Sequence, residues 1–381
     1  MPDARLRSPV SELSLSMKIS EVISHLESFA PPALQESYDN CGLLVGNPLT
    51  DITGVLVSLD CTEAIIDEAV KTGCNLVVSH HPIVFSGLKK FTGKTYIERT
   101  VISAIKNNIA IYAVHTNLDN VSHGVNSRIA AVLGLQNTKI LSPKSGLLKK
   151  FVTFCPADSA EKVREALWSA GAGYIGNYDR VSYNLEGHGT YRGNENSNPV
   201  IGEKGKMMRE PEERIEIIYP VHIEGKLLQA LRASHPYEEV AYDLYPMTNE
   251  WQQVGSGMIG ELAVPLGQNE FLGLVKNMLK APVIRYTPVA GKQIKRVAIC
   301  GGSGSFLLGD AIRAGADAFV TADFKYHQFF DAEGKILIAD VGHFESEQFT
   351  IDLLSDKLKE IILTFAVRKT EIVTNPINYH V

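Results

Sequence analysis

The 381-residue chain has few cysteines and no long apolar run. Its five cysteines form no C-x-x-C pair, and their odd number does not indicate a disulfide framework. They are typical of reduced, mostly buried residues in a cytoplasmic protein. No window reaches the roughly 18 uninterrupted apolar residues that a membrane helix needs. The sequence therefore predicts a cytoplasmic protein that does not span a membrane.

An excess of positive charge is missing as well. Lysine and arginine number 37 against 43 acidic residues, which gives a net charge of -6 and a pI near 6.0. Nucleic acids and anionic membranes attract basic surfaces, so neither is an expected partner. Residues 1 to 16 lack the apolar core of a secretory signal, and we expect them to form a disordered leader.

Two parts of the chain show apolar runs that alternate with helical spacing. Runs typical of buried strands lie at 52–59, 76–78, 109–114, 296–300, 318–321 and 335–339. Such alternation predicts right-handed crossovers and mainly parallel strands. Between them, residues 149–253 show the order β-α-β-β-α-β of a ferredoxin-like unit. The sequence thus predicts a three-layer α/β core, residues 17–148 and 254–381, split by an inserted ferredoxin-like α+β domain.

Two adjacent histidines follow one of these runs directly. His80 and His81 come after Leu76 to Ser79, and Pro82 follows them. Neighbouring side chains of a regular strand point to opposite faces, so both histidines reach one site only where the strand has ended. Pro82 provides that end, and the carboxyl ends of strands are where open α/β sheets bind ligands. A pair of solvated loop histidines explains this stretch equally well.

A second motif places His343 and Glu347 four residues apart at the start of a predicted helix, on the same face. Alone, this spacing is common in surface pairs. With His80, His81 and the strand-end Asp119 it makes five candidate metal ligands, too many for one tetrahedral ion with an open position. Two ions about 3.5 to 4 Å apart fit better, with Asp119 or Glu347 as the bridging carboxylate. Nitrogen and oxygen ligands suit zinc, manganese, iron or cobalt without selecting among them.

Other polar residues near predicted strand ends have two interpretations each. Asp323 and His327 are candidate proton carriers, or a helix cap and a solvated side chain. His115 could support a ligand or be a sixth one, or simply be hydrogen-bonded at a strand end. Backbone amides between a predicted strand and helix could bind a phosphate or another anion, although such turns are common. These amides belong to Gly301, Gly302, Ser303 and Gly304.

Several spaced motifs resemble the Nif-three-like dinuclear metal-centre family, whose bacterial members are often called GTP cyclohydrolase type-two homologues. They are Ser37 to Gly46, Ser79 to Ile83, His115 to Asp119, Cys300 to Ser305 and Gly342 to Glu347. The resemblance implies that the five candidate ligands occupy the family's ligand positions. Residues 235–243 resemble the PII- and CutA-like insert of longer members, which implies a homo-oligomer, a trimer or hexamer. Residues 121–124 depart from the family pattern, which leaves the shape of that site wall open.

Two functions are compatible with these features. The first is a dinuclear metal-dependent hydrolase of a small molecule, with a GTP cyclohydrolase as the candidate suggested by the resemblance. In that reaction, metal-activated water attacks a purine nucleotide; a phosphoester hydrolase fits the same chemistry. The second is a metal-binding oligomer that regulates or scaffolds partners without catalysis. Both use the same ligands, so the sequence leaves enzyme activity open.

Overall fold

The chain forms two compact units, which are described separately. Unit 1 combines Met1–Asn137 with Gly260–Val381, and unit 2 comprises Thr138–Ile259. The structure is a computed structural model and describes residues 17–289, 291–362 and 365–380. The predicted leader, residues 1–16, lies outside the described residues. None of the helices in the described part of the chain has the length and apolar character needed to cross a bilayer.

The first sheet of unit 1 has five strands in the order β1-β4-β3-β2-β15. They are β1 Gly42–Val45, β2 Gly54–Ser58, β3 Leu76–Ser79, β4 Ala110–Ala113 and β15 Ala366–Lys369. β15, β2, β3 and β4 run parallel, and β1 is antiparallel to β4. Every residue of β2, β3 and β4 is buried, which explains why their sequences are apolar apart from the terminal Ser58 and Ser79.

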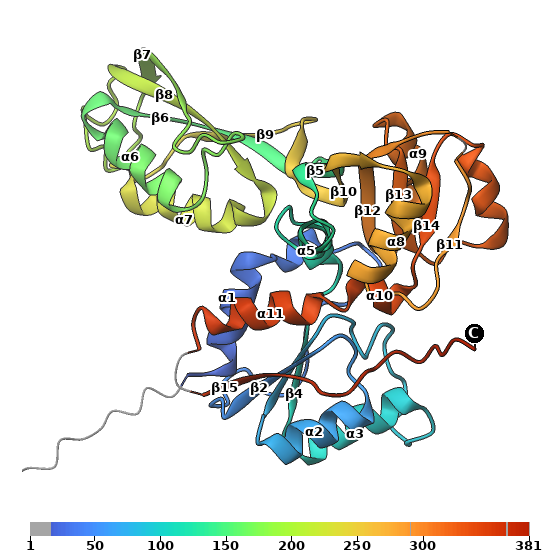
Figure 1. The fold of residues 1–381 in the computed structure, drawn as a ribbon. Helices are drawn as coiled ribbons and strands as arrows, with labels where there is room; N and C mark the ends of the chain where they lie inside the picture. The colour runs from blue at the N-terminus through green and yellow to red at the C-terminus, as the bar shows by residue number, and fades with distance from the viewer. Residues whose placement is uncertain (1–16, 290, 363–364, 381) are drawn as a thin grey trace, which may run out of the picture. The chain divides into compact units, whose positions relative to one another are not determined.

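Helices cover both faces of this sheet (Figure 1). α2 Glu63–Thr72 and α3 Tyr96–Lys106 lie on one face, and α1 Ile19–Phe29 and α11 Thr350–Lys359 lie on the other. Leu56, Val77 and Ile111 pack in one cluster with Ile65 and Val101 of the first helix pair. The sheet is therefore fixed by apolar burial, which leaves its carboxyl edge for polar side chains.

The second sheet has six strands in the order β11-β14-β13-β12-β10-β5. They are β5 Gln136–Ser145, β10 Glu250–Leu266, β11 Arg285–Tyr286, β12 Ile294–Ser303, β13 Ala318–Ala322 and β14 Leu337–Asp340. β12, β13 and β14 are parallel, and β11 is antiparallel to β14. The α/β class is confirmed, and the strands form two sheets. Each sheet includes a strand from the other half of the chain, since β15 pairs with β2 in the first sheet and β5 lies at the edge of the second.

The remaining helical elements of unit 1 are mostly short. They are η1 Pro32–Leu34, α4 Thr116–Asp119, α5 Val125–Val132, α8 Gln268–Met278, η3 Ser305–Leu307, α9 Leu308–Arg313, η4 Tyr326–Ala332 and α10 His343–Glu347. The sequence predicts one helix from about 344 past 359, whereas the structure has the separate helices α10 and α11.

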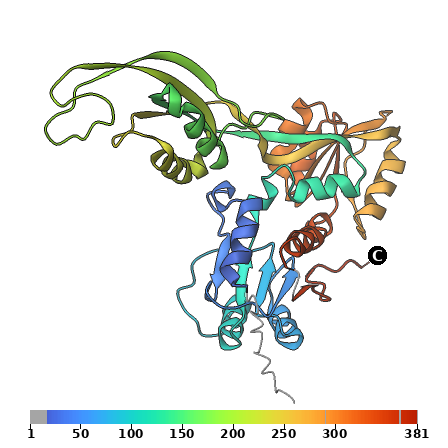
Figure 2. The same cartoon turned by 90° about the vertical axis from the view of Figure 1, so that its left-hand side faces the viewer.

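Unit 2 contains a four-stranded antiparallel sheet in the order β7-β8-β6-β9. Its elements are β6 Leu148–Pro156, α6 Ala157–Ser169, β7 Tyr183–Tyr191, β8 Met208–Pro220, η2 Val221–Ile223, α7 Glu224–Ser234 and β9 Tyr242–Pro246. Both helices pack on one face of the sheet (Figures 1 and 2), where Phe151 and Ile217 meet Val163, Leu167 and Leu231.

Candidate metal centre

The carboxyl edge of the first sheet brings the amino-terminal candidate ligands together. His80 and His81 directly follow β3, and His115 and Asp119 follow β4. Since β3 and β4 are parallel neighbours, their carboxyl ends open at the same edge. Ser79 closes the end of β3 with a hydroxyl hydrogen bond to the carbonyl of His81, at 2.9 Å.

The other two candidate ligands come from α10. Gly342 precedes this helix with φ +98°, in the left-handed region. One helical turn then places His343 Nε2 at 3.1 Å from Glu347 Oε2. His81 Nε2 lies 3.0 Å from the same oxygen, although 266 positions separate these residues in the chain. The structure thus brings all five predicted ligands to one place.

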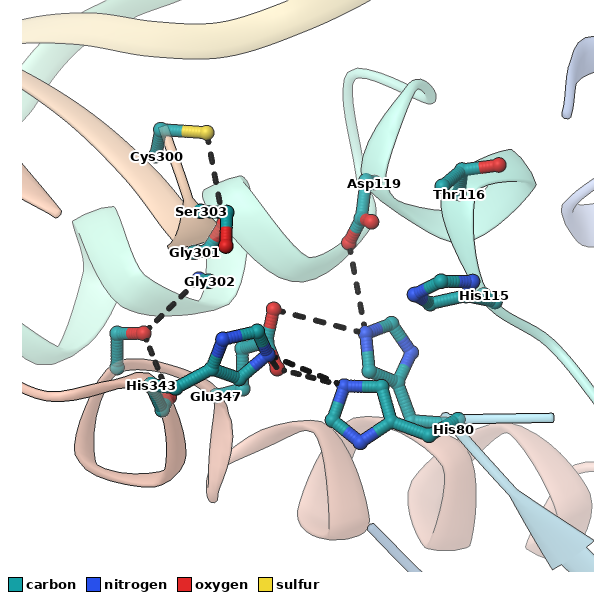
Figure 3. Close-up of polar contacts among 12 residues, drawn as sticks. His80, His115, Thr116, Asp119, Cys300, Gly301, Gly302, Ser303, His343 and Glu347 are labelled. Carbon is teal, nitrogen blue, oxygen red and sulfur yellow. Dashed lines mark hydrogen bonds and ion pairs between the residues drawn. The ribbon is translucent and has the colours of Figure 1, made fainter. Parts of the chain in front are cut away.

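Glu347 divides the cluster into two groups, one at each carboxylate oxygen (Figure 3). His81 and His343 meet Oε2, and their Nε2 atoms are 3.4 Å apart. On the side of Oε1, His80 Nε2 lies 3.8 Å from that oxygen and 3.7 Å from Asp119 Oδ1. A third group joins His80 and His81 to His115. Each of these groups has the residue types and spacing that could hold a metal ion.

Two buried atoms of this cluster test whether it fits a cation. His80 Nε2 and Asp119 Oδ1 have no hydrogen-bond partner within the described part of the chain. A buried polar group without a partner costs about 1 to 3 kcal/mol. A metal ion between these lone pairs would satisfy both, so the residues fit a cation.

All four histidines of the cluster use Nδ1 for a hydrogen bond to a carbonyl or carboxylate oxygen. The partners are Val114 O for His80, Asp60 Oδ1 for His81, Asp39 Oδ1 for His115 and Asp323 Oδ2 for His343, at 2.8, 2.8, 2.8 and 2.7 Å. In the neutral imidazole these bonds place the proton on Nδ1 and turn the Nε2 lone pair toward the cluster. Metal-binding histidines are oriented in this way.

Close opposite charges perturb the ionisation of these groups. Burial alone would lower the pKa of His81, but hydrogen bonds that its ring donates to the Asp60 and Glu347 carboxylates raise it to about 9. Burial likewise opposes charge on His343, yet Asp323 and Glu347 raise its pKa to about 11. Burial and the Glu347 carboxylate raise the pKa of Asp119. In the absence of metal, the raised pKa values therefore favour protons on the side chains that a metal ion would bind.

Comparison with known proteins places the chain in a family. A model of Duf34/NIF3 (NGG1p interacting factor 3) matches residues 17–376. The chain belongs to this family. A GTP cyclohydrolase 1 type 2 homolog of Halalkalibacterium halodurans is 40% identical over 352 residues, 91% of this chain and 94% of that protein. One of the same name from Bacillus subtilis is 36% identical over 334 residues, 87% and 90% of the two chains.

Solved structures agree with this assignment. A Bacillus cereus protein related to NIF3 superposes with a TM-score of 0.84 at 36% identity, and the match covers 96% of this chain and 100% of that one. A Staphylococcus aureus protein gives a TM-score of 0.76 at 29% identity, over 96% and 99% of the chains. The family part of the resemblance is therefore confirmed.

Sequence reasoning missed two carboxylates of the candidate centre. Asp60 follows β2 at the same sheet edge and orients His81. Its position after a predicted strand could have identified it as a candidate site residue. Asp39 lies in the polar stretch before β1 and orients His115. Burial opposes its charge, but hydrogen bonds from His115, Thr116 and Cys41 hold the pKa of Asp39 below its usual range. The signal for Asp39 was only the density of polar residues there.

The two predicted proton carriers have different surroundings. Asp323, with φ +59°, accepts hydrogen bonds from His343 Nδ1 and from the Ser303 hydroxyl, so it contacts a candidate ligand directly. His327 is exposed on η4, where its ring packs against Tyr326 and Phe330. Proton transfer by either residue stays a prediction.

The predicted glycine-rich turn is largely part of β12. The strand continues to Ser303 through a bulge, since its register with β13 shifts between Ile299 and Ser303. The Gly301 amide donates to Asn126 Oδ1 at 3.0 Å and the Gly302 amide to Ser346 Oγ at 2.9 Å. Anion binding by residues 301–304 stays a prediction, but two of their amides already have partners inside the protein.

Proposed function

We propose that this NIF3-family protein binds two divalent metal ions and uses them in hydrolysis. His81, His343 and Glu347 would hold one ion, and His80, Asp119 and Glu347 the other. The observation that carries the proposal is the set of imidazoles fixed at Nδ1 whose Nε2 atoms converge on a shared carboxylate. Mixed nitrogen and oxygen ligands favour zinc, manganese, iron or cobalt.

The surrounding residues have distinct tasks in this proposal. Divalent ions of this kind acidify water and withdraw electrons from an electrophilic carbon or phosphorus. Asp60 and Asp323 hold the rings of His81 and His343 in place. His115 lines the cavity beside the cluster with its Nδ1 held by Asp39, so it is placed to accept and return a proton.

The candidate reaction is cyclohydrolase chemistry on a purine nucleotide. Support comes from the name of the relatives, GTP cyclohydrolase 1 type 2 homolog. That name belongs to the relatives and describes their similarity to a GTP cyclohydrolase. A phosphoester hydrolase would use the same ligands and the same water chemistry. The site therefore supports hydrolysis more directly than it supports one substrate.

We further propose that unit 2 is an inserted ferredoxin-like domain of the PII and CutA kind, and that it assembles the chain into trimers or hexamers. The succession β6-α6-β7-β8-α7-β9 and the strand order β7-β8-β6-β9 support the ferredoxin-like assignment. Native mass spectrometry of the full chain tests the assembly, and a monomer at micromolar concentration would contradict it.

Metal analysis and an activity screen test the main proposal. Protein purified without chelators should carry about two metal ions per chain. Glu347→Ala should lose at least one, whereas the exposed control Glu360→Ala should lose none. GTP and phosphoester hydrolysis should disappear in His81→Ala. If the protein contains no bound metal and takes up neither zinc nor manganese, the dinuclear proposal is wrong. Two bound ions without turnover would favour the regulatory alternative.

A further inference from the structure

The C-terminal segment, residues 370–380, passes along the edge of the candidate centre. It leaves β15, which is parallel to β2, so it emerges at the same sheet edge as Asp60. The Thr374 hydroxyl donates to Asp60 Oδ2 at 2.6 Å. Next to it, Asn375 Nδ2 donates to Glu345 Oε1 on α10 at 3.1 Å. One short segment is thus tied to both parts of the chain that supply candidate ligands.

This segment forms a wall of a cavity of about 380 Å³ beside the cluster. The polar part of the lining comes from three histidines, one carboxylate and one amide: His81, His115, His343, Asp60 and Asn375. Much of the remainder is apolar and comes from different elements: Leu59, Pro82, Phe85, Phe344, Pro376 and Ile377. Phe85 and Ile377 are 47% and 52% exposed. Large apolar side chains left exposed around a polar site mark a surface that binds something.

The polar groups of this lining are poorly suited to binding a phosphate group. Among the described residues that line it, none is a lysine or an arginine. Asn375 has its amide occupied on both sides, since it donates to Glu345 and accepts from the Ile377 amide at 3.0 Å. Away from the histidines that face the cluster, the lining therefore offers no cation to a phosphate group, which is usually bound by cationic side chains or free amides. The lining instead offers flat and apolar surfaces, which suit an aromatic ring.

We propose that this cavity binds a planar, uncharged heteroaromatic ring, such as a nucleobase, and that Pro376 and Ile377 form one of its walls. The proposal rests on the proposed function only in placing that ring beside the catalytic ions. It assigns the C-terminal segment a role in substrate recognition, because the segment supplies lining residues and holds Asp60.

Binding of guanosine to the zinc-loaded full chain tests this assignment. Titration calorimetry should detect guanosine, and ribose 5-phosphate should neither bind comparably nor displace it. Ile377→Ala should weaken guanosine binding about fivefold, because it removes apolar contact area. Phe85→Ala should act in the same direction. The matched control is Val373→Ala, which removes an exposed side chain of the same segment outside the lining and should leave binding unchanged.

Three results would overturn the assignment: no detectable guanosine binding, equal affinity of Ile377→Ala and wild type, or displacement of guanosine by ribose 5-phosphate. Metal content measured on the same samples separates this from the proposed function. If the protein carries its metal but does not bind guanosine, the pocket assignment is wrong and the proposed function still stands. If it binds guanosine but shows no metal-dependent turnover, the proposed hydrolase is wrong and the pocket assignment still stands.

Discussion

Substituting Gly302 by alanine should damage the candidate centre through one carbon atom. A Cβ at this position would lie 2.3 Å from Glu347 Oε1 and 3.2 Å from His343 Cε1. An ordinary contact begins near 3.4 Å, so the carboxylate must move by roughly 1 Å. Metal–ligand distances in proteins lie within about 0.2 Å of their standard values, so a shift of this size is incompatible with unchanged coordination. We therefore expect Gly302→Ala to weaken zinc binding about 10- to 100-fold, comparable to loss of a residue that orients a ligand.

The backbone effect of this substitution has to be separated from its effect on the site. Gly302 has φ +62°, and alanine in this left-handed region costs about 1 to 2 kcal/mol. Gly73 has φ +72°, and a Cβ there would have no heavy atom within 4 Å, so Gly73→Ala carries the backbone cost alone. In urea unfolding of metal-free protein, Gly73→Ala should therefore lose about this backbone cost, and Gly302→Ala should lose at least as much because of its additional contact with Glu347.

Zinc affinity, measured by competition with a chromophoric chelator, distinguishes the two variants. Gly73→Ala should bind zinc as wild type does, and only Gly302→Ala should lose affinity. A Gly302→Ala protein that folds and keeps the wild-type affinity would refute the reasoning, because Glu347 could then not be a ligand in its present position. If Gly302→Ala does not fold, Glu347→Gln tests the same carboxylate without a backbone change.

Two further predictions concern protons and orientation. At pH 7.5 the raised pKa values keep His81 and His343 protonated without metal, so zinc uptake should release about two protons per chain, measured by calorimetry in buffers of different ionisation enthalpy. A heat of zinc binding that does not depend on the buffer would contradict this release of protons. The raised pKa of His81 also contributes to the stability of the metal-free protein, and this contribution is fully present below pH 6.5 and is lost as the pH rises through about 9. Thr374→Val should weaken zinc binding about threefold to tenfold, less than Asp60→Asn, because it removes only the hydroxyl that holds Asp60; a wild-type affinity would show that the C-terminal segment does not position His81.

Local rules were sufficient to predict the candidate ligands from the sequence. The buried run before His80 predicts a strand end, and the four-residue spacing of His343 and Glu347 predicts a shared helix face. Both patterns depend on neighbours in the chain. The structure brings His81 and Glu347 within 3.0 Å, as expected if these patterns belong to one site.

The remaining features depend on contacts between distant residues. Asp60 holds His81 because β2 pairs with β3. Its position at a strand end could have marked Asp60 as a site residue, but the sequence does not show that it contacts the His81 ring. The bulge at Gly302 arises from the pairing of β12 with β13, and the glycine there resembled a phosphate-binding turn. Division of the strands into two sheets likewise depends on pairing, which apolar periodicity does not specify.

The arrangement around Glu347 links the bulge to the metal proposal. A side chain at position 302 would occupy the space of Oε1, the oxygen that faces His80 and Asp119. The Gly302 amide also donates to Ser346, which fixes α10 beside β12. The same glycine therefore supplies room for one carboxylate oxygen and an anchor for the helix that carries it. A glycine in a flexible turn needs neither contact, so the close approach of Glu347 is a sufficient reason for glycine at position 302.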